Sequence, residues 1–211
     1  MKTKAKAVNN SSLPSNIFVL GDSVTKISGT AGNDTISGTA GNDVIAGNAG
    51  NDVIAGNAGD DFLLGNRGED FLLGNRGNDV VHGGEQNDIV YGGFGDDMVY
   101  GDEGDDFVSG DEDNDVLFGG TGSDTFYFGG TKASTALSAG NDVIRDFTFD
   151  GATMGDKIQI VGLGSAFDSY SEFISGAQQT ADGVLFDFGG NRSLLVEGVT
   201  IDELTSDYFI F

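Results

Sequence analysis

The chain has 211 residues, of which 34 are Asp or Glu and 10 are Lys or Arg, giving a formal net charge of −24. A charge of this sign repels phosphate backbones and anionic lipids, so we expect no nucleic-acid binding and no membrane insertion. The chain has no Cys, which excludes disulfides and thiolate metal sites, and no apolar run near the roughly 20 residues of a transmembrane helix.

Residues 1–28 are predicted to form a flexible N-terminus and a degenerate capping coil. The first ten residues lack the apolar stretch of a signal peptide, and we expect residues 1–15 to be loose. Residues 16–28 keep the phase of the repeat that follows, because Ile27 lies one repeat unit before Ile36. We therefore interpret them as a coil that covers the N-terminal end of the repeat.

Residues 29–128 consist of eleven units of equal length, nine positions each, with Gly first, Asp sixth and an apolar residue eighth. The fourth position is Gly except at Gln86 and Asp113. Asn and Gly, which are frequent at the second position, tolerate a positive φ, whereas Thr30 and Thr39 fit that conformation less easily. The sixth-position residues are Asp34, Asp43, Asp52, Asp61, Asp70, Asp79, Asp88, Asp97, Asp106, Asp115 and Asp124.

Each unit divides into a turn and a strand. The first six residues are Gly-rich and polar, which predicts a turn, and the last three, such as residues 44–46, are β-formers with an apolar centre. Such a turn reverses the chain, so two consecutive units should close one coil. We predict an all-β fold, a parallel β-roll in which two facing sheets bury the eighth-position residues and the turns follow both edges.

The sixth-position Asp residues would line up along each edge at about 5 Å spacing and repel one another. Residues 29–128 contain 21 acidic side chains and 2 basic ones, Arg67 and Arg76, so a cation is needed between the turns. Carboxylate and carbonyl oxygens on flexible turns favour Ca²⁺. Ions shared by turns two units apart allow up to nine sites. The alternative is a charged solvated face, but such a face would mix Asp with Glu and Lys.

Several units, including GTAGNDTIS at 29–37, GGFGDDMVY at 92–100 and GGTGSDTFY at 119–127, resemble the RTX (hemolysin-type) nonapeptide GGxGxDxUx. The resemblance covers residues 29–128. It implies a parallel β-roll with Ca²⁺ in its turns, a secreted protein, and the type I secretion machinery as a partner.

Residues 129–211 are predicted to form a β-rich C-terminal cap and secretion-signal region. The motif AGNDVI recurs at 139–144, and Asp142 lies two unit lengths after Asp124, which predicts a further metal site on the same edge. Residues 184–188 and 193–199 predict a β-hairpin, and residues 169–175 a short helix. Thr200 to Glu203 resembles a capping box that starts a helical turn.

The final residues, 206–211, allow two interpretations. An acidic residue followed by four apolar ones resembles the C-termini of type I secreted proteins. The same residues could form a last strand packed on the hairpin, and both interpretations can hold together.

Catalytic motifs are not recognisable in the sequence, which has no GxSxG, HExxH or Walker loop, and we expect no enzyme. Equivalent Asp residues form a lattice, whereas a catalytic pair needs two different environments. His82, the one His, stands at a ninth position and is interpreted as a surface residue.

The predicted function is therefore that of a secreted calcium-binding protein whose folding depends on extracellular calcium. One alternative is an adhesion or surface-layer module that binds an extracellular protein or surface partner. Another is a calcium-dependent module of an extracellular enzyme whose catalytic domain lies on another chain.

The outward seventh and ninth positions are unusually apolar, which bears on the first alternative. We expect the terminal segments to fold over them instead. These residues are Phe62, Leu64, Phe71, Leu73, Tyr91, Tyr100, Phe107 and Phe118.

Overall fold

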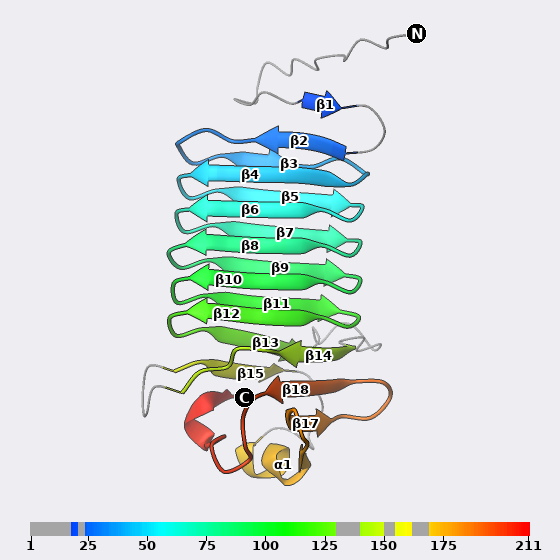
Figure 1. Cartoon of the computed structure of the whole chain (residues 1–211), viewed down its shortest axis with the longest axis vertical. Helices are drawn as coiled ribbons and strands as arrows, with labels where there is room; N and C mark the ends of the chain where they lie inside the picture. Colours follow the sequence, from blue (N-terminus) through cyan, green and yellow to red (C-terminus); the bar gives the residue numbers. More distant parts are fainter. Residues whose placement is uncertain (1–17, 21–23, 130–139, 150–154, 162–168) are drawn as a thin grey trace.

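Figure 1 shows the computed structural model of the chain, which describes residues 18–20, 24–129, 140–149, 155–161 and 169–211. The fold is a two-sheet parallel β-solenoid of about six turns with a mixed sheet at its C-terminal end, and it contains almost no helix. The predicted all-β roll is confirmed. The predicted domain boundaries after residues 28 and 128 stay a prediction, and the expectation for residues 1–15 lies outside the described residues.

Two sheets lie face to face and run the length of the roll (Figure 1). The strands of the roll in the 11-stranded sheet are β2 (Val24–Ser28), β4 (Asp43–Ala49), β6 (Phe62–Arg67), β8 (Val80–Glu85), β10 (Met98–Glu103), β12 (Val116–Thr121) and β14 (Asn141–Ile144). Those of the 8-stranded sheet are β3 (Thr35–Ser37), β5 (Val53–Ala58), β7 (Phe71–Arg76), β9 (Ile89–Phe94), β11 (Phe107–Glu112), β13 (Thr125–Gly129) and β15 (Lys157–Val161).

Neighbouring strands of the repeat pair in parallel, each with the strand two units further along the chain. Ile45 pairs with Leu63 in one sheet and Ile54 pairs with Leu72 in the other. The predicted coil of two units is therefore confirmed. The predicted N-terminal coil keeps this register, because Ile27 on β2 pairs with Ile45, and β1 (Phe18–Leu20) adds an antiparallel strand beyond it.

The core is the continuous file of eighth-position side chains between the two sheets. From Ile45 to Phe126 these side chains are at most 1% exposed. Side chains alternate across a strand, so one apolar residue per unit is enough to fill the space between the sheets. Full burial of each such side chain contributes about 1.5–3 kcal/mol, and the file therefore holds the two sheets together.

The predicted strand length is correct for the first unit and too short for most of the others. β3 has 3 residues, as expected, whereas most later strands of the roll have 6 and include the first three positions of the following unit. The turn there shrinks to the fourth to sixth positions. Composition predicted a turn for these Gly-rich residues, but pairing with strands on both sides holds them in the sheet.

The C-terminal residues lie against the end of the roll (Figure 1). The predicted hairpin is confirmed as β17 (Gly183–Asp187) and β18 (Ser193–Glu197), which pair antiparallel, and β16 (Ala177–Gln179) adds to β17. The predicted short helix is α1 (Tyr170–Ser175).

The chain ends in a turn, a short helix and a strand. Glu203 Oε2 accepts hydrogen bonds from N and Oγ1 of Thr200, so the predicted capping contact is present in a turn. After the 3-10 helix η2 (Ser206–Tyr208), the last strand β19 (Phe209–Ile210) pairs with β15 in the opposite sheet, not with the hairpin. The ring of Phe209 still reaches the hairpin, at 6.2 Å from that of Phe186.

The expectation that the terminal segments cover the outward apolar residues is wrong for the described part of the chain. The described C-terminal segments stack on the end of the roll and leave its faces uncovered (Figure 1). The outward rings instead pack on one another, because residues at the same position of alternate units are neighbours in a sheet. His82 stacks on Tyr100 at 4.2 Å, and Tyr100 stacks on Phe118 at 4.5 Å. In the described residues, no helix is long and apolar enough to cross a membrane.

Candidate metal-binding turns

The sixth-position Asp residues of the roll point into the turns, and all eleven are buried. One carboxylate oxygen, Oδ1, accepts a hydrogen bond from the main-chain amide of the sixth-position Asp two units earlier. The amide of Asp52, for example, lies 2.7 Å from Oδ1 of Asp70, and the same contact of 2.7–2.9 Å recurs up to Asp124. These bonds form two ladders of carboxylates, one along each edge of the roll.

The other oxygen, Oδ2, has no hydrogen-bond partner in nine of these turns. Within the described residues these atoms are both buried and unpaired, and they belong to Asp52, Asp61, Asp70, Asp79, Asp88, Asp97, Asp106, Asp115 and Asp124. A buried polar atom without a partner costs about 1–3 kcal/mol, and more when it is charged. Nine such atoms in one small fold indicate that they have a partner that the protein itself does not supply.

The first-position Gly residues leave room for a backbone carbonyl oxygen close to the unpaired Oδ2 atom. A Cβ built on Gly74 would collide with Oδ2 of Asp79 in the same unit and with the carbonyl oxygen of Gly92, two units further along the chain. The same two kinds of atom surround Gly47, Gly56 and Gly65. Gly is therefore required here because a carboxylate and a carbonyl oxygen approach closely, and the φ of these residues is not positive.

The burial of the carboxylates changes their acid–base behaviour. Burial is the largest cause that raises the pKa of Asp97 and Asp115, each to about 8, while a hydrogen bond from a main-chain amide lowers it and neighbouring carboxylates raise it further. The same causes raise the pKa of Asp88 to about 8 and of Asp61 to about 7. Without a counter-cation, these carboxyl groups hold protons near neutral pH.

The donor set fits a hard divalent cation. Within the described residues no group of three or more His, Cys, Asp or Glu side chains comes together, so a cation in these turns would depend on backbone carbonyls beside the Asp oxygen. Ca²⁺ accepts this mixture of carboxylate and carbonyl oxygens, whereas softer metals prefer imidazole or thiolate.

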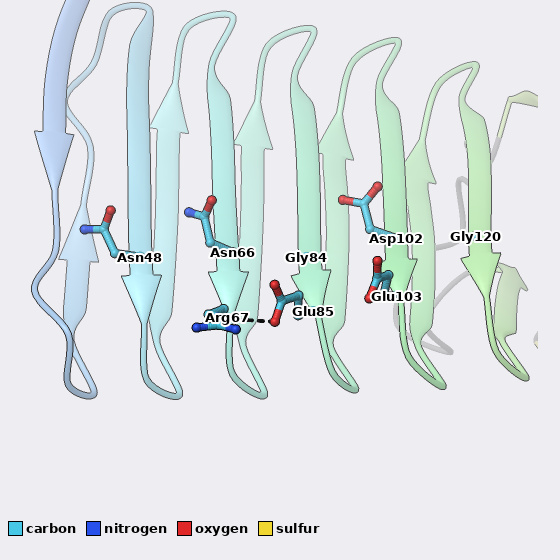
Figure 2. A pocket seen from close by; sticks show the side chains of 8 residues that line it. All are labelled: Asn48, Asn66, Arg67, Gly84, Glu85, Asp102, Glu103 and Gly120. Carbon is cyan, nitrogen blue, oxygen red and sulfur yellow. Dashed lines mark hydrogen bonds and ion pairs between the residues drawn. The ribbon is translucent and has the colours of Figure 1, made fainter.

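The second position of each later unit has an unusual backbone conformation. Asn48, Asn66 and Asp102 have φ values of 82°, 78° and 79°, and Gly84 has φ 126°. Figure 2 shows these residues at equivalent places on successive strands, beside the exposed ion pair of Arg67 and Glu85. The conformation favours Gly, Asn or Asp, which are the residue types that the sequence places at the second position after the first two units.

Asp34 and Asp43, the first two predicted site residues, differ from the nine. Oδ2 of Asp34 accepts hydrogen bonds from N and Oγ1 of Thr30, at 2.6 and 2.9 Å. Oδ2 of Asp43 is bonded in the same way by Thr39, at 2.5 and 3.0 Å. Both carboxylates are therefore satisfied by the protein itself.

Asp142 is the second residue of β14 and lies on the opposite edge of the roll from the predicted one. The main-chain amide of Asp115, not that of Asp124, donates to Oδ1 of Asp142 at 3.1 Å. The prediction assumed that the two-unit spacing continues past Asp124. Instead β14 pairs with β12, which carries Asp142 to the edge of Asp115.

Asp156 takes the place that was predicted for Asp142, and the sequence analysis missed it. The amide of Asp124 donates to Oδ1 of Asp156 at 2.9 Å. An insertion separates the two residues by 32 positions, so the regular spacing of the repeat does not reveal the relationship. The remaining signal was the triplet Asp156-Lys157-Ile158, which repeats the order of Asp and apolar residue found in every unit.

His82 lies on the outer face of the roll, away from these turns. Its Nδ1 is 2.9 Å from Oδ2 of Asp102, and its side chain is partly exposed. The prediction of a surface residue is confirmed.

Comparison with known proteins identifies the repeat. Residues 28–63, 64–99 and 100–130 match the family described as RTX calcium-binding nonapeptide repeat (4 copies). No curated protein gives a match to the chain.

Two solved structures match the chain at low identity. The extracellular lipase LipA of Serratia marcescens is 17% identical with a TM-score of 0.39, and the match covers 92% of this chain and 40% of the lipase. The AlgE6R3 subunit of the Azotobacter vinelandii mannuronan C5-epimerase is 18% identical with a TM-score of 0.29, covering 100% of this chain and 86% of that subunit. The chain thus spans about two fifths of the lipase. Residues 28–130 are thus RTX calcium-binding nonapeptide repeats of the hemolysin type.

Proposed function

We propose that the chain is a secreted calcium-binding protein whose turns hold Ca²⁺ between stacked coils, so that folding is coupled to extracellular calcium. The observation that carries this proposal is the set of nine buried Oδ2 atoms without a hydrogen-bond partner among the described residues. The main-chain amide of each of these Asp residues donates a hydrogen bond to Oδ1 of the equivalent Asp in the next coil, as Asp52 does to Asp70. We expect one ion for each of these turns, hence about nine ions.

The ligands proposed for each ion are the Oδ2 atom of one turn, backbone carbonyl oxygens of that turn, and backbone carbonyl oxygens of the turn stacked on it in the next coil. In the turn that ends at Asp79, these would include the carbonyl of Gly92. Bound Ca²⁺ supplies the positive charge and the oxygen coordination that these atoms lack. Without it, the buried carboxylates of successive coils repel one another once the pH exceeds their raised pKa, and this repulsion opposes the pairing of the strands.

The coupling between metal and folding follows from the distribution of the ligands. Oxygens of one site come from two different coils, as with Oδ2 of Asp79 and the carbonyl oxygen of Gly92, so no site exists before the coils have stacked. Binding free energy therefore becomes folding free energy. Extracellular calcium modules bind with Kd of about 10⁻⁴ to 10⁻³ M, so we expect a folded chain outside the cell and an unfolded chain inside it.

A titration of the metal-free chain with Ca²⁺ tests the proposal. Calorimetry should give a stoichiometry near nine, and far-UV circular dichroism should report the gain of β structure over the same range of calcium concentration. At pH 8, a chain that folds fully in chelator, or that binds one or two ions, would show that the unpaired oxygens are not metal ligands.

Export by a type I secretion system is the second part of the proposal, and it rests on the RTX repeats and on the resemblance of residues 206–211 to such C-termini. Because β19 packs in the fold, a deletion of these residues disturbs both folding and any signal. Co-expression with a type I exporter separates the two effects. A core variant such as Leu72→Ala should still be exported, because export precedes folding, whereas deletion of 206–211 should retain the chain in the cell.

A surface-interaction module is a second candidate, which the uncovered faces of the roll favour. Phe62, Met98, Val53 and Ile89 are 37–44% exposed. Phe62 and Met98 lie on one sheet, and Val53 and Ile89 lie on the other. An extracellular protein or surface partner would bury the apolar residues of one of these two faces. Retention of the calcium-loaded chain on cells should fall in a Phe62→Ser, Met98→Ser variant, and should not change in Glu85→Gln. The alternative of a calcium-dependent module of an extracellular enzyme stays a prediction.

A further inference from the structure

The first two turns of the roll differ from the other nine in backbone conformation. In the nine later units the second and fourth positions have positive φ, as at Asn57 and Gly59 with 82° and 112°. The corresponding Gly32 and Gly41 of the first two units do not have positive φ, nor do Thr30 and Thr39. These two turns are also the ones whose first five residues all lie outside the strands.

In the first two turns, protein donors occupy the atoms that a cation would need. Thr39 donates to Oδ2 of Asp43 through both its main-chain amide and its hydroxyl. The carbonyl oxygen of Gly38 accepts a hydrogen bond of 2.9 Å from Nδ2 of Asn57. The turn of Thr30 is built in the same way, with Nδ2 of Asn48 at 2.8 Å from its Gly carbonyl. A cation would have to displace these donors.

A threonine also satisfies the carboxylate at the opposite end of the roll. Thr148 donates to Oδ2 of Asp156 through its amide at 2.7 Å and its hydroxyl at 3.2 Å. Asp156 is the last sixth-position equivalent on its edge in the described residues, just as Asp34 and Asp43 are the first on theirs. The edge that runs from Asp34 to Asp156 thus uses the same pair of donors at both of its ends.

The residue at the second position decides which form a turn takes. Thr is β-branched, and a positive φ forces its side chain against the backbone, so it keeps the turn in which its amide faces the carboxylate. Asn, Asp and Gly accept the positive φ and leave Oδ2 without that donor. The correspondence is complete in the described roll, because the nine units with positive φ at this position are the nine with an unpaired Oδ2.

We propose that Thr30, Thr39 and Thr148 replace the cation at the turns of Asp34, Asp43 and Asp156, so that these three terminal turns are metal-independent caps. The number of ions is then set by how many second positions hold Asn, Asp or Gly. This inference rests on the proposed calcium function and specifies which turns carry it. It removes Asp34 and Asp43 from the predicted ligands whose Oδ2 binds Ca²⁺.

Substitutions at the second position test the inference on the full chain. Thr39→Asn should open the second turn and raise the calcium stoichiometry by one, with Asn57 released to bond locally as Asn66 does with the carbonyl of Leu64. Thr39→Ser keeps the hydroxyl donor and should leave the count unchanged. In the opposite direction, Asn75→Thr should remove one ion, and Asn75→Gly, which permits a positive φ, should not.

Anomalous diffraction from crystals grown in calcium locates the ions directly. The wild-type map should show peaks beside the nine unpaired Oδ2 atoms and none beside Oδ2 of Asp34, Asp43 and Asp156, with a new peak beside Asp43 in Thr39→Asn. Wild-type peaks at these three carboxylates, or an unchanged count in both Thr39→Asn and Asn75→Thr, would overturn the inference and leave the calcium function intact. A wild-type map without any calcium peak would overturn the proposed function itself.

Discussion

The main-chain amide of Asp70 lies 2.7 Å from Oδ1 of Asp88, while Oδ2 of the same Asp88 carboxylate is buried and has no hydrogen-bond partner in the described part of the chain. The two oxygens of one side chain therefore have separate tasks. Oδ1 joins neighbouring coils, and Oδ2 is the oxygen proposed to bind the cation. An Asn side chain could supply an oxygen in the position of Oδ1, but its NH2 group would then stand in the position of Oδ2.

Asp61→Asn should remove one metal site without breaking the ladder. The remaining Oδ1 can still accept the amide of Asp43, which lies at 2.7 Å in the native chain. At a free calcium concentration about 100-fold above Kd, the loss of one ion lowers the free energy of unfolding by about 2.7 kcal/mol. Urea unfolding in calcium measures this loss. In chelator the variant should be no less stable than the wild type, because a buried carboxylate has been removed.

The adjacent residue gives a matched control. Asp60 is exposed, and its Oδ1 accepts the amide of Asn78 at 3.0 Å, a contact that Asn makes equally well at positions 33 and 42. Asp60→Asn should therefore leave both the calcium count and the stability nearly unchanged. An equal loss in the two variants would mean that net charge alone, and not the buried oxygen, controls stability.

Gly74→Ala should abolish the site that ends at Asp79. The added methyl would occupy the space of Oδ2 of Asp79 and of the carbonyl oxygen of Gly92. We expect one ion fewer in a calorimetric titration and a higher calcium midpoint for folding. Gly41→Ala is the control, because a Cβ there meets no atom within 4 Å and the φ is not positive. If the two variants behave alike, the close approach at the first position is not what requires Gly.

The metal-free chain should fold better at acidic than at neutral pH. In the fold the pKa of Asp61 rises from its ordinary value of 3.8 to about 7, and that of Asp97 to about 8, chiefly through burial. The folded state therefore binds more protons than the unfolded state between about pH 4 and 8. Stability is highest below the unfolded pKa and is lost as the pH rises through the folded pKa.

Circular dichroism of the chelated chain from pH 3.5 to 8 follows this loss. We expect β structure at the acidic end and its disappearance towards pH 8. In calcium the trend reverses, because the carboxylates must release protons to bind metal. A metal-free chain that gains structure as the pH rises would contradict the burial of these carboxyl groups.

Leu72→Ala should lower the free energy of unfolding by about 2–5 kcal/mol, because it empties part of the closed file between the sheets. Leu72 is fully buried, whereas Val53 points outward and is 44% exposed. Val53→Ala should therefore have a much smaller effect. Urea unfolding in saturating calcium compares the two, and similar losses would indicate that the outer faces are covered in solution.

The repeat itself predicts the coil and the core. Asp and an apolar residue recur once in every unit, and a strand of period two can bury only one of its three residues between the sheets. The pairing of Ile45 with Leu63 and the burial of both follow from that spacing. Strand length did not follow, because Asn66 and Gly84 look like turn residues by composition but pair with each other across the sheet.

The sequence by itself determined the period, the inward file and the oxygen chemistry of the turns, because these depend on spacing and residue type within each unit. The tertiary structure decided which oxygen atoms lack a partner and which edge Asp142 and Asp156 join. Both outcomes depend on hydrogen bonds between residues 18 to 32 positions apart. After an insertion, the number of residues between two Asp no longer predicts whether they are neighbours. The strand pairing in the folded chain then determines these contacts.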